Sequence, residues 1–349
     1  MKDIHGVHPE LAVCDLSPSM IGAVSAVFGE HVLGIDGFHV MQELNNGIRR
    51  DLLDFRDGRF KTEINDLHAT RDWISRVQEG IANGMPVVTA ITAAGVFPEV
   101  DSCHEMSQTA RHFTSQVLDL VIHEDPGLFF SELASFLEQN EASSCEHVRS
   151  FVHDMRPAIP AIRFTEKGML RVEKTLLRKL KTFYLDFRAK LEEESTQFYK
   201  DHWVVFFQPE RMTGPRQERL DGFLARYPEL NVYRTMTLQV GEIYRLPVEA
   251  IDGHQITTLE EQPGFSEKLN TAIKTLKKHA ASILRFVDVF KRNPGLPKRC
   301  RATTEWSNVR FKKPFKAGNN LVKKEHLLIR LRAQLHGTID WRIPEAKVI

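Results

Sequence analysis

Residues 13–50 read "VCDLSPSMIGAVSAVFGEHVLGIDGFHVMQELNNGIRR", and this stretch decides the fold of the N-terminal region. Two short apolar runs each end in an aspartate, Asp15 and Asp36. Each run is followed by hydrophobic residues at helical spacing, over residues 17–29 and 38–55. The order strand, helix, strand, helix predicts an α/β arrangement with both carboxylates at the carboxyl ends of strands, where open sheets place their sites.

Both predicted helices carry an apolar face, which is typical of a helix that packs against a core. Ser17 can cap the first helix, and Pro18 suits its first turn. The residues expected on the two apolar faces are Met20, Ile21, Val24, Val27 and Phe28, and then Phe38, Met41, Leu44, Ile48, Leu52 and Phe55.

Beyond residue 56 the pattern is helical as far as about residue 205, which predicts a large all-α part. Residues 165–203 are expected to form one long helix. Proline and glycine predict breaks near residues 84–86, 126–127, 157–160 and 214–215. The apolar stripe expected on the long helix consists of Leu170, Leu176, Leu177, Leu180, Phe183, Phe187 and Leu191.

Charge is distributed unevenly along the 349 residues, although the net charge is only +1. Residues 1–150 contain 23 acidic and 10 basic side chains, whereas residues 268–332 contain 18 basic and three acidic ones. A basic block of this kind is typical of a segment that contacts a polyanion, and its alternative is a solvated helix face. We therefore expect contact with a nucleic acid.

Several classes of protein are excluded by what the sequence lacks. It has no CxxC pair, no HExxH motif, no P-loop and no GxSxG elbow, which argues against zinc sites, NTPases and α/β hydrolases. Four scattered cysteines predict buried free thiols in a reducing compartment. The chain shows no signal peptide and no run of 18 apolar residues, so we expect a cytoplasmic protein without a membrane partner.

Glu305 stands out as an isolated acid inside the basic block, and it is either an ion-pair partner or a metal ligand beside a phosphate backbone. Asp15 is equally open, because an aspartate before Ser-Pro is also a routine helix cap. Asp36 and His39 can form a local hydrogen-bonded turn, and a lone histidine on an apolar helix face is usually a satisfied core residue.

Taken in order, these blocks resemble insertion-sequence transposases of the ISL-three type, which belong to the DDE superfamily. The N-terminal block looks like that family's Asp-Met-Ser turn, helix, Asp-Arg-Phe-His-Val and arginine-ended helix. Residues 199–246 and "TLKKHAASILRFV" look like its later segments, and "TEWSNVRFKKPFKAGNNLVKKEHLLIRLR" resembles its Glu-Gly-x-Asn-x-x-x-Lys block. The resemblance covers residues 8–56 and 199–335.

The resemblance implies an RNase H-like core in which three acids bind two Mg²⁺ or Mn²⁺ ions, and a homo-oligomeric complete enzyme. Asp15 matches the second acid and Glu305 the third, so the resemblance makes both of them catalytic residues and metal ligands. Asp36, His39 and Asn308 match supporting residues. The basic side chains expected along the DNA are Lys312, Lys313, Lys316, Lys323 and Lys324.

The sequence departs from the family at Met20, Gly37 and Trp306, where tyrosine, arginine and glycine are usual. It also offers no separate strand for the first acid, because Asp3 and Glu10 lie too close to Asp15. The expectation is an incomplete RNase H-like core, interrupted by a helical insertion and lacking its N-terminal part.

The expected organisation follows from these matches. Residues 1–56 form the first part of the core, residues 57–263 a mainly helical insertion, and residues 264–349 the basic part that carries the third acid. The predicted function is Mg²⁺-dependent DNA transposition by a truncated copy that binds metal weakly and is inactive or nearly so. The alternatives are a non-catalytic DNA-binding or oligomerising protein and a helical scaffold unrelated to transposition.

Overall fold

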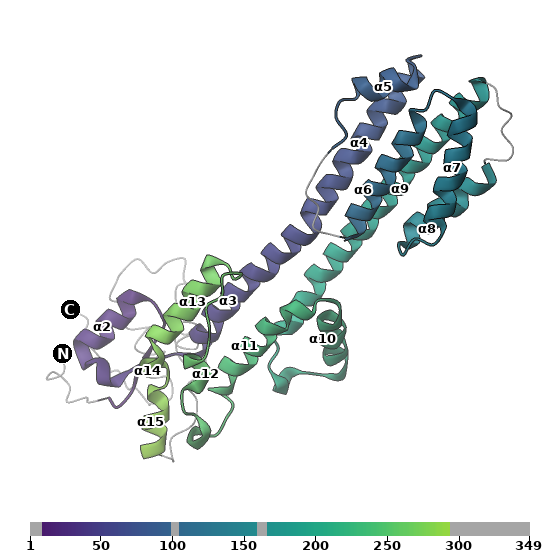
Figure 1. Ribbon diagram of the computed structural model, residues 1–349. Helices are drawn as coiled ribbons and strands as arrows, with labels where there is room; N and C mark the ends of the chain where they lie inside the picture. The colour runs from purple at the N-terminus through teal and green to yellow at the C-terminus, as the bar shows by residue number, and fades with distance from the viewer. Residues whose placement is uncertain (1–8, 99–104, 159–165, 294–349) are drawn as a thin grey trace, which may run out of the picture. The chain divides into compact units, whose positions relative to one another are not determined.

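The computed structural model describes residues 9–98, 105–158 and 166–293. The described chain is mostly helical, with one two-stranded parallel sheet (Figure 1). It divides into two compact units. We call residues 1–52 and 204–349 the strand unit, and Leu53–Trp203 the helical unit.

The strand unit contains both strands and the helices that surround them. Its strands and longer helices are β1 (Ala12–Cys14), α2 (Pro18–Phe28), β2 (Leu33–Ile35), most of α3 (Gly37–Arg56), α10 (Gly214–Arg226), α11 (Asn231–Glu242), α12 (His254–Thr257), α13 (Glu267–Lys278), α14 (Ala280–Ile283) and α15 (Arg285–Arg292). Short 3-10 turns lie at Glu30–Val32, Pro209–Arg211, Pro228–Leu230 and Val248–Ala250.

The predicted order of strand, helix, strand and helix is confirmed. β1 and β2 pair in parallel with Cys14 opposite Ile35, and α2 forms the crossover that parallel strands require. The pairing continues past the strands, because the Asp36 amide donates to the Cys14 carbonyl over 2.9 Å. The described residues supply two strands, so the RNase H-like core remains a prediction.

α3 forms as its hydrophobic spacing predicts, and it packs closely against α13. Its buried residues include Val40, Leu44, Ile48 and Leu52. Gly47 permits the close approach, because a Cβ there would lie 2.9 Å from the Leu269 Cα.

Phe38 was predicted on the apolar face of α3, but its side chain is 40% exposed. The prediction was wrong because helical spacing assigns Phe38 to a face, whereas burial requires a neighbouring element at that particular turn. α2 shows the same limit on a larger scale, since none of its residues is buried.

The helical unit contains longer elements. It begins with the last turn of α3 and a π-helical turn (Asp57–Lys61), and a 3-10 turn (Arg156–Ala158) follows α8. Another 3-10 turn (His202–Phe206) follows α9. The remaining helices are α4 (Thr62–Ala82), α5 (Val87–Ala93), α6 (Glu105–Val121), α7 (Pro126–Glu141), α8 (Glu146–Met155) and α9 (Glu166–Asp201).

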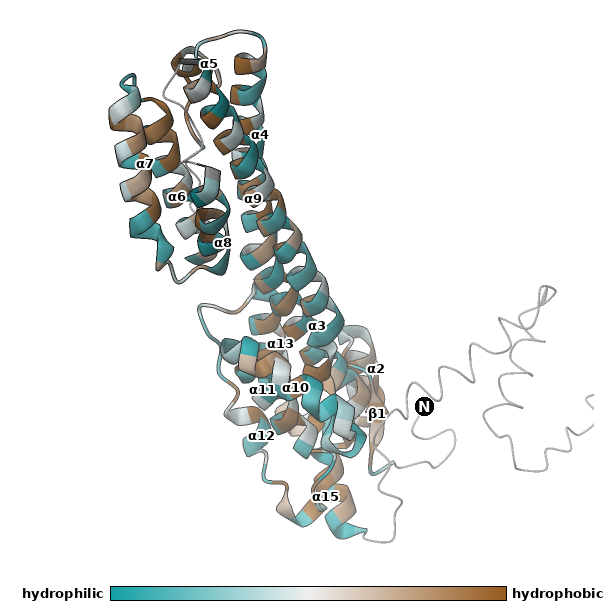
Figure 2. Ribbon diagram, turned by 90° about the vertical axis from the view of Figure 1, so that its right-hand side faces the viewer, coloured by the Kyte–Doolittle hydropathy of each residue, from teal (hydrophilic) through white to brown (hydrophobic). Residues whose placement is uncertain are grey.

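The single long helix predicted over residues 165–203 is confirmed as α9, which packs along α4 (Figure 1). Six residues of its predicted apolar stripe are buried, and Leu170, which is 38% exposed, is the exception. In Figure 2 hydrophobic and hydrophilic residues alternate along these helices, as expected for amphipathic helices around a shared core.

Aromatic rings form the centre of the helical unit. The ring of Phe113 lies 5.0 Å from Phe151, 5.2 Å from Phe136 and 5.6 Å from Phe183, measured between centroids. Edge-on and tilted contacts of this kind add to the burial of the rings themselves. The aromatic core therefore joins four helices, α6 to α9, that follow one another in the chain.

The predicted insertion of residues 57–263 ends later than the helical unit, which ends at Trp203. Residues 204–263 belong instead to the strand unit. Asp51 gives the physical reason: this buried carboxylate accepts hydrogen bonds from the Tyr233 hydroxyl over 3.1 Å and the Ser266 amide over 3.0 Å. These bonds fasten α11 and the start of α13 to α3.

Candidate functional site

The candidate site lies at the carboxyl ends of the two parallel strands. Asp15 directly follows β1, and Asp36 directly follows β2. Because β1 and β2 are parallel and in register, both aspartates are at the same edge of the sheet. The structure therefore brings together two residues that are 21 positions apart in the sequence.

Asp15 is half-buried and is held by Ser17. Its Oδ1 accepts hydrogen bonds from the Ser17 hydroxyl over 2.6 Å and from the Ser17 amide over 3.0 Å. The hydroxyl bond is the main reason that the pKa of Asp15 lies below its usual value, and the amide bond and nearby His39 lower this pKa further, against the opposing effect of burial. Asp15 is therefore a carboxylate at neutral pH.

Ser17 was expected to cap the first helix with its side chain, and this was wrong in detail. Ser17 does occupy the N-cap position of α2, but its side chain makes no capping hydrogen bond. Its hydroxyl donates to Asp15 instead, because the preceding carboxylate is a stronger, charged acceptor.

Asp36 is fully buried and begins α3. Its Oδ1 accepts a hydrogen bond from the Phe38 amide over 2.8 Å, and its carbonyl accepts one from the His39 amide over 3.1 Å. This is the geometry of a helix cap, which satisfies amides that have no partner within the helix. The local-turn interpretation of Asp36 thus describes its geometry well.

His39 lies on the first turn of α3, close enough to Asp15 to influence its ionisation. Its Nδ1 lies 3.2 Å from the Gln42 Oε1, and its ring meets the Phe38 ring edge-on at 5.3 Å between centroids. Asp15, Asp36 and His39 therefore form one group at the strand ends.

Cys14, the residue before Asp15, is buried. Burial and the neighbouring Asp15 charge raise its pKa to about 11, so it stays a thiol and is a poor nucleophile. Cys145 was also predicted to be buried, but it is half-exposed at the start of α8.

The remaining predicted site residues cannot be placed beside this group. Glu305, Asn308 and the five lysines Lys312, Lys313, Lys316, Lys323 and Lys324 lie outside the described residues. The described part of the basic block does include α13, whose exposed cations are Lys268, Lys274, Lys277 and Lys278.

The residues that the structure describes do not complete a Mg²⁺ site. No group of three or more His, Cys, Asp or Glu side chains suited to a metal occurs among them. Asp36 is committed to the Phe38 amide, and Asp15 shares one oxygen with Ser17. A two-metal centre needs several carboxylate oxygens around each ion, so no catalytic step can be derived from these side chains alone.

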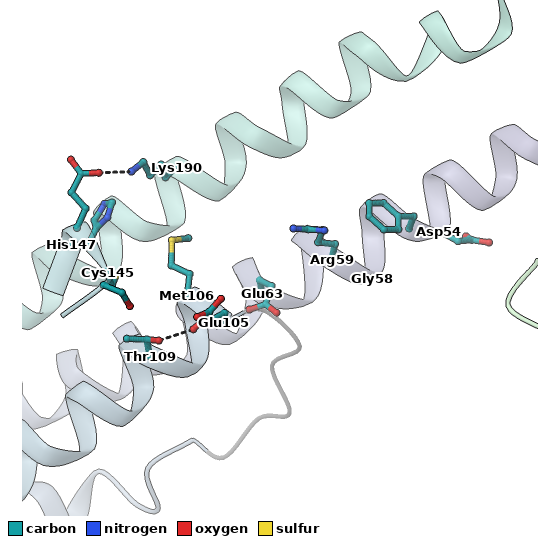
Figure 3. Close-up of a pocket in the computed structure, with 13 residues that line it drawn as sticks. Asp54, Gly58, Arg59, Glu63, Glu105, Met106, Thr109, Cys145, His147 and Lys190 are labelled. Atoms are coloured by element: carbon teal, nitrogen blue, oxygen red, sulfur yellow. Dashed lines mark hydrogen bonds and ion pairs between the residues drawn. The ribbon is translucent and has the colours of Figure 1, made fainter. Parts of the chain in front are cut away.

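A second place with ionisable side chains is a cavity of about 980 Å³ within the helical unit. Figure 3 shows Lys190 and His147 on one side and Arg59 and Glu63 on another. The His147 ring packs on Phe187 at 4.4 Å between centroids, and burial, followed by the Lys190 charge, lowers its pKa. No sequence pattern predicts this cavity, because its walls come from segments that are distant in the chain.

The chemistry of this cavity is limited. Cys145 and His147 line it together, but the described residues show no hydrogen bond between them. Lys190 is 4.0 Å from Glu146, which is a solvent-exposed ion pair. A nucleophile paired with a base is therefore not formed here, and the strand ends remain the better candidate.

A third candidate place, which no sequence motif predicts, adjoins the strand ends. A cavity of about 530 Å³ begins at Gly37, the residue after Asp36. Its other walls come from residues 206–211 and 241–245, which belong to the same strand unit. Short loops between helices gave no periodic signal that could have revealed it.

Comparison with known proteins found no matching family model, no matching curated protein and no matching solved structure. Among the described helices, none combines the length and the apolar character needed to cross a membrane.

Proposed function

We propose that this chain is a DNA-transposition protein of the insertion-sequence type, and that its strand unit contacts the DNA. The observation that supports this best is a combination within one compact unit. Asp15 and Asp36 follow adjacent parallel strands, and the lysine-rich α13 leads into α14 and α15, which pack on β2. Acids at strand ends beside cationic helices suit a protein that acts on a phosphodiester backbone.

The cations of α13 supply the electrostatic part of this proposal. Lys268, Lys277 and Lys278 are exposed, and Lys274 is exposed beside Glu261 at 3.1 Å. Lys277 and Lys278 occupy the last turn of α13, where their positive charges interact favourably with the helix dipole. The dipole alone does not account for Lys268, which lies in the first turn.

Asp15 is the residue we assign to metal binding, together with Glu305. Bound Mg²⁺ or Mn²⁺ would activate the attacking oxygen and neutralise the leaving one. Asp36 and His39 would act as positioning residues, since Asp36 fixes the start of α3 and His39 lies near Asp15. Because Asp36 is buried, Asp15 is the accessible carboxylate at the described strand ends, and we expect weak metal binding and little or no cleavage by this chain alone.

DNA binding by the full chain tests the proposal directly. Fluorescence polarisation with a labelled 30-base-pair duplex should show binding at 50 mM NaCl. The affinity should fall by about 100-fold by 200 mM NaCl, the slope expected for about four neutralised phosphates. Absence of binding at 50 mM NaCl, or an affinity that does not change with salt, would contradict the proposal.

A matched pair of variants tests the assignment to the strand unit. Changing Lys268, Lys274, Lys277 and Lys278 together to glutamine should remove most of the salt dependence. The control removes the same charge from α9 by changing Lys167, Arg171, Lys174 and Arg178 to glutamine. If the α9 variant loses more of the salt dependence of DNA binding than the α13 variant, the DNA contact surface lies in the helical unit and the assignment is refuted.

Metal binding separates the transposase proposal from its alternative. Mn²⁺ binding followed by electron paramagnetic resonance should weaken about tenfold in Asp15→Asn. Asp252→Asn is the control, because Asp252 makes a similar hydrogen bond to the His254 amide over 3.0 Å. DNA binding combined with Mn²⁺ binding that does not depend on Asp15 would favour the non-catalytic DNA-binding protein instead.

A further inference from the structure

The cavity beside Asp36 combines aromatic, amide and cationic side chains in one small space. Its volume is about 530 Å³. Phe38, Met41 and Asn45 come from the first turns of α3. The opposite walls are the segment 206–211 and the end of α11 with the residues that follow it.

Aromatic rings form much of the wall. Phe38 is 40% exposed, which leaves its ring accessible. The Tyr244 ring lies so close to Gly37 that a Cβ at Gly37 would approach it to 2.5 Å. Any larger residue at position 37 would displace the Tyr244 ring, so Gly37 is matched to this cavity.

Three buried polar atoms of the cavity have no hydrogen-bond partner among the described residues. They are the Asn45 Oδ1, the Gln208 Oε1 and the Arg245 Nε. The Arg245 Nη2 donates to the Leu238 carbonyl over 3.3 Å and lies 3.9 Å from Glu242, whereas its Nε lies 3.8 Å from Glu210, beyond hydrogen-bond distance. Buried polar atoms are nearly always hydrogen-bonded, so their concentration at one cavity indicates a polar ligand.

The Gln208 amide is held in place from two sides. Its Nε2 donates to the Thr237 carbonyl over 3.3 Å. Gly241 makes room for it, because a Cβ at Gly241 would lie 2.2 Å from the Gln208 Oε1. The Gln208 amide therefore has a fixed position, and its Oε1 still lacks a hydrogen-bond donor among the described residues.

The wall formed by residues 205–208 is anchored by Arg234. This buried guanidinium donates to the Val205 carbonyl over 3.1 Å and to the Phe207 carbonyl. Burial, followed by the charge of Arg245, lowers the pKa of Arg234. The cations that line the cavity are Arg211, which is exposed, and Arg245, which is paired with Glu210 and Glu242. Arg211 therefore supplies the positive charge that favours an anion beside the cavity.

We infer that this cavity binds an unpaired nucleobase, with its sugar-phosphate directed toward the arginines. An exposed aromatic ring offers a stacking surface, and asparagine and glutamine amides are suited to the polar edge of a base. The base can come from an extruded or single-stranded nucleotide of bound DNA, or from a free mononucleotide. The first source rests on the proposed DNA-binding function.

The test compares two labelled duplexes that each carry a five-nucleotide single-stranded overhang, one intact and one abasic. Fluorescence polarisation with the full chain should give about tenfold tighter binding to the intact overhang. Asn45→Ala combined with Gln208→Ala should abolish this difference while leaving the affinity for blunt duplex unchanged. Asn46→Ala combined with Gln217→Ala, which changes exposed amides of the same unit, should preserve it.

A second variant guards against loss of folding. Phe38→Ala removes an exposed ring, so its thermal unfolding should match that of the wild type while its preference for the intact overhang falls. Equal affinity for intact and abasic overhangs, with duplex binding retained, would overturn this inference and leave the DNA-binding proposal standing.

A competition arm with free dAMP and dTMP distinguishes the two sources. Displacement of the overhang by mononucleotide, dependent on Asn45 and Gln208, would assign the site to free nucleotides. If no duplex binds at all, the proposed function fails, and direct titration of dAMP then decides this inference alone. Saturable binding that is lost in the double variant would support the inference, and no binding would overturn it.

Discussion

α2 in the strand unit and α6 in the helical unit differ in how many of their residues are buried. α6 buries eight of its 17 residues, whereas α2 buries none of its 11, although α2 is the more apolar in sequence. α6 contacts α7, α8 and α9 through the Phe113 ring, whereas α2 connects two strands of three residues each. Apolar composition therefore permits burial, but the number of elements around a helix decides it.

Buried carboxylates give the same contrast on a smaller scale. Asp51 in the strand unit is satisfied by Tyr233 and Ser266, and it joins three helical segments. Glu173 in the helical unit is also buried, and burial raises its pKa. In the strand unit, buried Asp51 thus connects helical segments through hydrogen bonds. In the helical unit, burial of Glu173 favours its neutral form.

The largest effect is expected where packing is densest. Phe113→Ala should destabilise the helical unit by about 3–5 kcal/mol, because it removes a ring that is 2% exposed and contacts three other rings. Chemical denaturation followed by circular dichroism measures the loss. Leu128→Ala, at a side chain 47% exposed, should change stability by less than about 0.5 kcal/mol. A similar small loss at Phe113 would mean that this core is not the main source of stability.

Two glycines of the strand unit should respond in opposite directions. Gly37→Ala should cost about 1–3 kcal/mol, since the added Cβ would lie 2.5 Å from the Tyr244 ring. Gly22→Ala should stabilise α2 by up to about 1 kcal/mol, because nothing lies within 4 Å and alanine favours a helix. Thermal unfolding of the two variants in parallel gives the comparison, and destabilisation by Gly22→Ala would show that α2 is covered after all.

The smallest effect is expected at Glu173 and depends on pH. Burial raises the pKa of Glu173 in the folded state. The stabilisation from the neutral Glu173 side chain is therefore present in full below its ordinary pKa of 4.5. This stabilisation is lost as the pH rises through the folded-state pKa, because the buried side chain then becomes charged. Glu173→Gln should therefore stabilise the protein by up to about 1 kcal/mol at pH 7 and change little at pH 4. Exposed Glu138→Gln is the control, and a gain at pH 4 equal to that at pH 7 would refute the assigned cause.

Much of the local structure could be predicted because its signals are short-range. Hydrophobic spacing predicted α2, α3 and α9. The position of Asp15 and Asp36 at the ends of two apolar runs predicted that both lie at the carboxyl ends of strands. Spacing could not identify Phe38 and Leu170 as exposed, because each lies at the correct interval but without a covering neighbour. The end of the helical unit at Trp203 has no local signal either, since the Tyr233–Asp51 bond spans 182 positions.

The sequence by itself determined where both strands and the helices α2, α3 and α9 lie, and that an acid follows each strand. These properties depend on side-chain spacing within a few turns of backbone. Only the tertiary structure decided which apolar faces are covered, that Asp51 fastens α11 and α13 to α3, and that Asn45, Gln208 and Arg245 border one cavity. The physical reason is that burial and hydrogen-bond satisfaction depend on which distant segments become neighbours, and no local pattern records that choice.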